Sequence, residues 1–275
     1  MKKLLYSVVI FFLMGSFAMA NSEKKNVIEC QIMSQSMNKN LPALVYLPDS
    51  YNTQQNKRYP VVYLIHGHGG NYKTWSHHFP HLQETASKYD FIIVCPDGGN
   101  SWYWDSPINP KLRYETFVSK ELIKFIDSKF RTKADRKARA IVGNSMGGHG
   151  ALFLAFRHQD VFSACGAIAG GVDIRPFPYN WNMQDSLGDA SKNAEIWDKH
   201  TVVNLVNLLK PNSLRIKFDI GTSDFFYHVN NRLHKELLYR NIPHDYTERP
   251  GAHTWDYAVK SLPYHFLFFS MGFKQ

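Results

Sequence analysis

Continuous apolar runs alternate with helix-like segments along most of the chain. The apolar runs, which are typical of strands buried on both faces of a sheet, are residues 59–65, 91–95, 140–142, 162–169 and 214–220. Helical patterns cover residues 78–89, 114–130, 151–156 and 226–240, and a last helix begins near Thr254. Weaker alternation at 27–33 and 42–47 predicts antiparallel edge strands, and 245–249 predicts one more short strand. This order predicts an α/β fold, with a doubly wound, mostly parallel sheet and helices on both faces.

Residues 172–200 interrupt this alternation. The segment contains Pro176, Pro178, Trp181 and Trp197 and has little periodicity. The rest of the chain is long and apolar enough for one large domain, at 275 residues and 44% hydrophobic. We therefore expect residues 172–200 to be an excursion over the functional site and not a second domain.

The N-terminal residues 1–20 have the pattern of a secretory signal peptide. Lys2 and Lys3 precede a mostly apolar stretch at residues 4–13, and Ala18-Met19-Ala20 offers small residues for cleavage. We expect cleavage near Ala20, a mature domain of residues 21–275, and export to the periplasm or the outside of the cell, with no stable membrane anchor. An uncleaved N-terminal anchor is the alternative.

Charge and cysteine content exclude some classes of function. Without residues 1–20 the net charge is (32 − 2) − 23 = +7. The densest basic stretch, residues 129–139, lacks the stacking aromatics and the module of a nucleic-acid binder. We therefore expect no nucleic-acid partner. The odd set Cys30, Cys95 and Cys165 leaves at least one thiol unpaired, and we expect no structural disulfide.

The candidate chemistry centres on Gly143-Asn144-Ser145-Met146-Gly147. This G-x-S-x-G pentapeptide lies between a predicted strand and a predicted helix, as in a nucleophile elbow. There the serine hydroxyl is held at a sharp turn above the edge of the sheet. The pattern predicts Ser145 as a nucleophile. The alternative is a glycine-rich turn in which Ser145 only caps the helix.

A serine nucleophile needs a base, and the base needs an orienting acid. His253 lies in a predicted strand-to-helix loop near the C-terminus and is the preferred base. The weaker candidates are His228, His234, His244 and His265. Asp224 follows a predicted strand end and is the preferred acid, and Asp219 within that strand is the alternative.

Two backbone N–H groups are candidates for an oxyanion hole. One belongs to Met146, the residue after the nucleophile, and the other to His68 in the loop 66–70. The same loop offers His66 and His68 as metal ligands. The metallohydrolase pattern H-x-H-x-D-H is nevertheless broken, because Gly70 and Asn71 stand where it needs Asp and His. We therefore expect no catalytic metal.

Four aromatic residues are candidates for substrate binding. Trp102, Tyr103 and Trp104 follow a predicted strand end, and Trp181 lies in the excursion. These residues could line an acyl pocket or stack on sugar rings. The alternative, equally open, is packing in the core beneath a long loop.

Several motifs occur together in chain order and resemble one family. They are YPVVYLIHGHGG at 59–70, PDGG at 96–99 followed by Ser101-Trp102-Tyr103, GNSMGGHGAL at 143–152, GTSDFF at 221–226 and GAHTW at 251–255. Together they resemble the esterase D-like family of α/β-hydrolases. That family includes S-formylglutathione hydrolases, feruloyl and acetylxylan esterases of carbohydrate esterase family one, enterochelin esterases and mycolyltransferases.

The resemblance implies an α/β-hydrolase fold without metal or organic cofactor. It also implies Ser145, Asp224 and His253 as the triad, with the His68 and Met146 N–H groups as the oxyanion hole. We expect an exported serine carboxylesterase that hydrolyses acetyl or feruloyl-type esters on a polysaccharide or its fragments through an acyl-enzyme. The alternatives are an acyltransferase with the same triad and a non-catalytic glycan- or wall-binding protein. The sequence leaves the acyl group, the glycan and the oligomeric state open.

Overall fold

The computed structural model describes residues 26–274, so the predicted signal peptide lies outside the described residues. Within them an eight-stranded sheet has the order β1-β2-β4-β3-β5-β6-β7-β8. The strands are β1 Val27–Ser34, β2 Lys39–Tyr46, β3 Val61–Ile65, β4 Ile92–Pro96, β5 Arg139–Asn144, β6 Ala164–Ile168, β7 Arg215–Gly221 and β8 Asp245–Arg249. The β1–β2 and β2–β4 pairs are antiparallel, and the other neighbours are parallel. The predicted mostly parallel sheet is confirmed, although of the first two strands only β1 lies at the edge.

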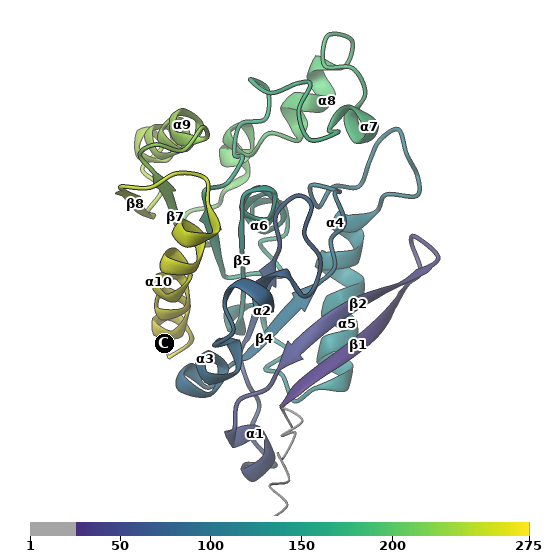
Figure 1. Ribbon diagram of the computed structural model, residues 1–275, viewed down its shortest axis with the longest axis vertical. Helices are drawn as coiled ribbons and strands as arrows, with labels where there is room; N and C mark the ends of the chain where they lie inside the picture. Colours follow the sequence, from purple (N-terminus) through teal and green to yellow (C-terminus); the bar gives the residue numbers. More distant parts are fainter. Residues whose placement is uncertain (1–25, 275) are drawn as a thin grey trace, which may run out of the picture.

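Helices cover both faces of the sheet (Figure 1). They are α1 Ser50–Thr53, α2 Thr74–His78, α3 Leu82–Tyr89, α4 Tyr114–Thr116, α5 Ile123–Lys129, α6 Met146–Arg157, α7 Gln184–Leu187, α8 Ala194–Lys199, α9 Tyr227–Tyr239 and α10 Trp255–Phe273. A π-helical turn at Phe117–Leu122 joins α4 to α5, and 3₁₀ turns lie at Arg136–Ala138 and Val202–Leu208. The helix expected at 78–89 begins later, at Leu82. Its predicted start is broken because Pro80 disfavours helical backbone at Phe79, which is non-helical at φ −130° and ψ 80°.

The apolar strands are buried on both faces because successive side chains point to opposite sides of the sheet. Val61, Tyr63 and Ile65 of β3 belong to the core under α5, α6 and α9. Val62 and Leu64 belong to the core under α2, α3 and α10. Each continuous apolar run thus contributes side chains to both cores. In such a sheet, ligands bind among the loops beyond the carboxyl ends of the strands.

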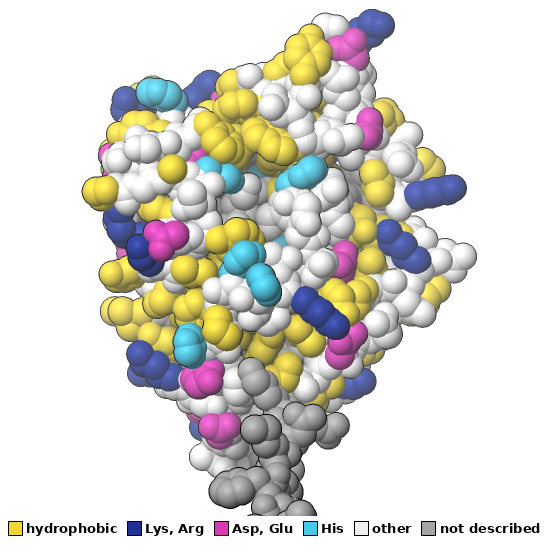
Figure 2. Space-filling model, viewed as in Figure 1, with side chains coloured by type: hydrophobic (Ala, Val, Ile, Leu, Met, Phe, Trp, Pro, Cys, Tyr) yellow, Lys and Arg dark blue, Asp and Glu magenta, His cyan; other side chains and the backbone are white. Residues whose placement is uncertain are grey.

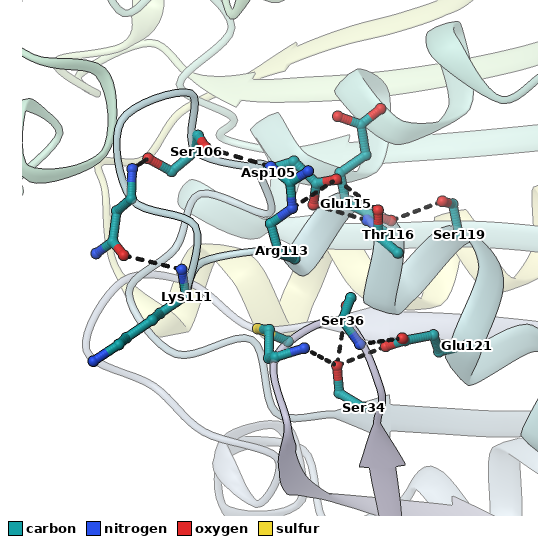
Figure 3. Close-up of polar contacts among 12 residues, drawn as sticks. Ser34, Ser36, Asp105, Ser106, Lys111, Arg113, Glu115, Thr116, Ser119 and Glu121 are labelled. Carbon is teal, nitrogen blue, oxygen red and sulfur yellow. Dashed lines mark hydrogen bonds and ion pairs between the residues drawn. The ribbon is translucent and has the colours of Figure 1, made fainter.

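Polar contacts hold the loops beside α4 and α5 in place (Figure 3). Asp105 accepts hydrogen bonds from the Thr116 backbone N–H at 3.0 Å and from its hydroxyl at 2.6 Å. Glu121 accepts from the Ser34 hydroxyl at 2.6 Å and from the Ser36 N–H at 2.8 Å. These bonds attach the β1–β2 hairpin and the loop after β4 to the same helical unit.

The excursion 172–200 carries α7 and α8 and lies at the upper end of the molecule in Figure 1. Asp173, at the start of the excursion, is almost fully buried. It forms ion pairs with Arg175 at 2.8 Å and with Arg232 of α9 at 2.9 Å. Burial alone would raise the pKa of Asp173, but hydrogen bonds and charge from Arg175 and the charge of Arg232 outweigh it and lower that pKa. The base of the excursion is thus fastened to α9.

No helix in residues 26–274 combines the length and apolarity needed to cross a bilayer.

A buried carboxylate joins β7, β8 and α10. Asp219 is fully buried, and its two oxygens lie 2.7 Å from His265 Nε2 and 2.6 Å from the Ser261 hydroxyl. Arg249 of β8 lies 3.7 Å away. Burial would raise the pKa of Asp219, but the bonds from His265 and Ser261 and the charge of Arg249 lower it overall. Asp219 is therefore fully engaged in holding α10 to the sheet.

Asp219→Asn is expected to destabilise the fold. Breaking one partner of a buried ion pair typically costs about 3–5 kcal/mol. Because the folded pKa is lowered, the stabilisation is complete above the unfolded pKa and is lost as pH falls through the folded pKa. The melting-temperature gap between wild type and variant should therefore be large at neutral pH and shrink in acid.

The matched control is Asp256→Asn, which removes an exposed ion pair to Lys260 on the same helix. This variant should melt with the wild type, because exposed pairs contribute little. Equal melting of Asp219→Asn and Asp256→Asn at neutral pH would contradict the assigned role.

Candidate active site

Ser145 lies in a strained turn between β5 and α6. Its backbone has φ 56° and ψ −119°, a region that residues with side chains rarely adopt. The strain is held by close packing on both sides of the turn. A Cβ on Gly143 would lie 2.6 Å from the backbone of Gly147, and a Cβ on Gly147 would lie 2.6 Å from the His66 carbonyl oxygen. Only glycine fits at these two positions, and the turn therefore projects Ser145 from the edge of the sheet.

A chain of hydrogen bonds runs from Ser145 to Asp224. The Ser145 hydroxyl lies 2.9 Å from His253 Nε2, and His253 Nδ1 lies 2.8 Å from Asp224 Oδ2. A carboxylate only accepts, so Nδ1 carries the proton and Nε2 is free to accept from the serine hydroxyl. Asp224 is buried, and its other oxygen accepts from the Phe226 N–H at 2.8 Å. The acid is thus fixed, while the side chain of His253 keeps 23% exposure.

Neighbouring parallel strands bring together the loop that carries Asp224 and the loop that carries His253. Asp224 follows β7, and His253 follows β8. The loops are joined by backbone bonds from Thr222 N–H to Arg249 at 2.9 Å and from Ser223 N–H to Gly251 at 2.8 Å.

The other candidate residues lie elsewhere. His265 pairs with Asp219 inside the molecule, His234 bonds His244 at 2.8 Å, and His228 is exposed on α9.

The loop after β3 packs directly on the nucleophile. A Cβ on Gly67 would lie 3.3 Å from the Ser145 Cβ. In residues 26–274, no hydrogen bond uses the backbone N–H of His68 or of Met146. Neither predicted oxyanion donor is therefore engaged within the described residues, and His68 lines the same pocket as Ser145.

His66 fixes this loop and is not free to bind a metal. Its Nδ1–H donates to the Gly67 carbonyl at 2.8 Å, and its Nε2 accepts from the Gly98 N–H at 2.8 Å. Both ring nitrogens are used, and burial lowers the pKa of His66, which keeps the ring neutral. The described residues hold no cluster of three metal-ligating side chains.

A pocket of about 300 Å³ opens at the nucleophile. Its walls include His68, Ser145, His253, His78 and Trp255. His78 and Trp255 stack face to face with ring centres 3.9 Å apart. Neither residue was assigned to the pocket from the sequence, because each belongs to a helix whose pattern does not indicate which face reaches the pocket.

The expectation that Tyr103 and Trp104 contact substrate is corrected by the structure, which places both in the core with no exposed surface. The Tyr103 hydroxyl donates to the His66 carbonyl at 2.9 Å, and Trp104 Nε1 donates to His149 Nε2 at 2.9 Å. Burial lowers the pKa of His149 to about 3, so this ring stays neutral and accepts that bond. Trp102 is also buried, at 2% exposure. These buried side chains thus support the loop at His66 and helix α6, which flank the turn at Ser145.

Trp181 has a different position. It is partly exposed and stacks on Phe225, with ring centres 5.8 Å apart. Phe225 is 51% exposed and lies 4.4 Å from the His253 ring. Figure 2 shows hydrophobic side chains and histidines gathered on this face, below the segment that carries α7 and α8. Phe225 was missed from the sequence, although its place directly after the candidate acid was a usable signal.

Ser145→Ala is expected to abolish acyl-transfer chemistry and leave the fold intact. The exchange removes the only atom that can attack, so kcat on a 4-nitrophenyl ester should fall by roughly 10⁴–10⁶. Unchanged melting would show that the variant is folded. A folded variant with more than about a tenth of wild-type turnover would overturn the assignment of the nucleophile.

Asp224→Asn is expected to lower kcat by about 10⁴ with little change in KM, because an amide no longer fixes the Nδ1–H tautomer of His253. Asp219→Asn serves as the comparison, since it should alter melting much more than kcat per folded molecule. The assignment of the acid fails if Asp219→Asn is the inactive enzyme and Asp224→Asn turns over normally.

Comparison with known proteins finds esterases. The chain is 30% identical over 237 residues to Esterase Rv1288 of Mycobacterium tuberculosis, covering 77% of this chain and 52% of that protein. It is 32% identical over 157 residues to an endo-1,4-beta-xylanase/feruloyl esterase of Xylanibacter ruminicola, covering 53% of this chain and 22% of that protein. The chain thus spans about half or less of the length of these relatives. Among solved structures, a ferulic acid esterase matches with TM-score 0.76 and 28% identity, covering 90% of this chain and 98% of that one.

A family model supplies the assignment. The Esterase model, described as "Putative esterase", matches residues 34–269, which include Ser145, Asp224 and His253. The chain therefore belongs to this esterase family.

Proposed function

We propose that this protein is a serine carboxylesterase. The observation that carries the proposal is the chain of hydrogen bonds from Ser145 through His253 to Asp224 beside two unused N–H groups. In this mechanism Ser145 Oγ attacks the ester carbonyl while His253 Nε2 takes its proton. The N–H groups of His68 and Met146 hold the oxyanion. His253 then gives the proton to the departing alcohol, and water repeats the sequence to release the acid.

The stacked rings of Phe225 and Trp181, called the aromatic wall below, support a hydroxycinnamoyl (feruloyl-type) group as the acyl part. Phe225 and Trp181 stack beside His253, so a planar aromatic group could join the stack next to the reacting carbonyl. The similarity to a ferulic acid esterase and to a xylanase/feruloyl esterase supports the same choice. Acetyl esters, the other group favoured by the sequence, would leave this wall unused.

The proposal places the ester on a polysaccharide or its fragments and the enzyme outside the cytoplasm. Export rests on the pattern of residues 1–20. An exported enzyme would not meet the cytosolic thioester that S-formylglutathione hydrolases use. The acyltransferase alternative keeps every step up to the acyl-enzyme and replaces water with a sugar hydroxyl.

A substrate panel is expected to show the acyl preference. Purified protein should hydrolyse feruloylated arabinoxylan oligosaccharides with a kcat/KM at least about tenfold above those for acetylated xylo-oligosaccharides and S-formylglutathione, because only the first offers an aromatic acyl group to the wall.

Phe225→Leu keeps an apolar contact with His253 but removes the ring. It should raise KM for the feruloyl ester by roughly tenfold and change the acetyl ester little.

The controls separate the parts of the proposal. Ser145→Ala provides the blank, and product analysis with excess xylo-oligosaccharide acceptor distinguishes hydrolysis from acyl transfer. Equal effects of Phe225→Leu on both esters would reject the aromatic subsite but keep the esterase. Failure of the folded wild type to turn over any ester, including a 4-nitrophenyl ester, would reject the esterase and favour a non-catalytic binding protein.

A further inference from the structure

A second cavity lies at the edge of the sheet opposite the triad. It has a volume of about 700 Å³ and is formed at the amino-terminal ends of β7 and β8, with the chain before them and α10. The triad residues follow the carboxyl ends of the same strands, so this cavity cannot contribute to the catalytic site.

The floor of the cavity is apolar. Val206, Leu214 and Ile216 contribute buried side chains, and the partly buried Leu209 and Ile242 extend the surface outward. A cavity of this size and lining fits a small organic body better than an ion alone.

One wall carries Arg215, a cation without a carboxylate partner in the described part of the chain. Its Nη2 donates to the Phe268 carbonyl at 2.8 Å, and the guanidinium lies 4.3 Å from the centre of the Phe268 ring. The group is packed so closely on α10 that a Cβ on Gly272 would overlap its Nη1. The Nε and Nη1 donors make no hydrogen bond within residues 26–274. Burial lowers the pKa of Arg215, which reflects a partly desolvated charge with no counter-ion.

The other charges around the cavity do not neutralise Arg215. Asp245 is already paired with the buried Lys217 at 3.1 Å, and Arg240 is paired with Glu236. The Lys210 ammonium, on the rim, has no ion pair among the described residues. The two charges at the cavity that have no ion pair among the described residues, Arg215 and Lys210, are therefore both positive.

From this pairing of charge and surface we propose that the cavity binds an amphipathic monocarboxylate, a carboxylate attached to an apolar body. The carboxylate accepts hydrogen bonds from Arg215 and attraction from Lys210, and the body covers Leu214, Ile216 and Leu209. A planar guanidinium matches carboxylate geometry, and a counter-ion would relieve its desolvated charge. The site is independent of the proposed esterase activity.

The test is isothermal titration of the full-length protein with decanoate below its micelle concentration. One decanoate should bind per chain. Decanol, which lacks the charge, and decyltrimethylammonium, which reverses it, should bind at least about tenfold more weakly. Acetate, which lacks the body, should not bind measurably.

Variants locate the site. Arg215→Gln keeps a donor for the Phe268 carbonyl but removes the charge, and it should weaken decanoate binding at least about tenfold. Arg58→Gln is the matched control. Arg58 also donates to a backbone carbonyl, that of Thr132 at 3.1 Å, without an ion pair, but it lies outside this cavity. Phe225→Leu tests for binding at the triad instead. Neither control should change the affinity.

The proposal is overturned if decanoate does not saturate, if decyltrimethylammonium binds as well, or if Arg215→Gln binds like the wild type. It is also overturned if Phe225→Leu is the variant that loses binding. Should Arg215→Gln fail to fold, the exposed Lys210→Glu replaces it. That variant is expected to weaken binding at least about threefold, and unchanged affinity would reject the site.

Discussion

The close approach of the Ser145 turn to the end of β3 is the constraint on which the site depends. Gly143 and Gly147 allow backbone to meet backbone where any side chain would collide, and Ser145 takes a left-handed conformation as a result. The packing of α6, which is buried from Met146 to Phe156, offsets the free-energy cost of that backbone conformation. Because the turn touches the loop after β3, the same packing places His68 and Ser145 on the walls of one pocket.

The parallel sheet explains why residues far apart in sequence meet. Ser145, Asp224 and His253 each follow the carboxyl end of a strand, and β5, β6, β7 and β8 are neighbours in that order. Loops after neighbouring parallel strands open on the same edge of the sheet. The amino-terminal edge of the same strands forms a different surface, where Arg215 and Lys210 face an apolar floor.

Two aspartate–histidine pairs show how position separates structure from chemistry. Asp219–His265 and Asp224–His253 have nearly the same length, at 2.7 Å and 2.8 Å. The first pair is wholly buried between β7 and α10 and has no access to a substrate. The second has a buried acid and a histidine with one ring edge toward the pocket. Only a pair at the strand end can pass a proton to a bound molecule.

The sequence by itself determined the alternation of strands and helices and therefore the fold, because buried runs and helical periodicity are local patterns. It also determined which loops carry Ser145, Asp224 and His253, because glycine-rich turns after strands are visible in one dimension. The tertiary structure alone decided which aromatic side chains are available. Trp102, Tyr103 and Trp104 follow a strand end like the site residues, yet they are buried, since the loop folds back under α6. Phe225 is half exposed beside His253, and Trp181 stacks on it from the excursion. Burial depends on what packs above a residue, and no local pattern in the sequence encodes that.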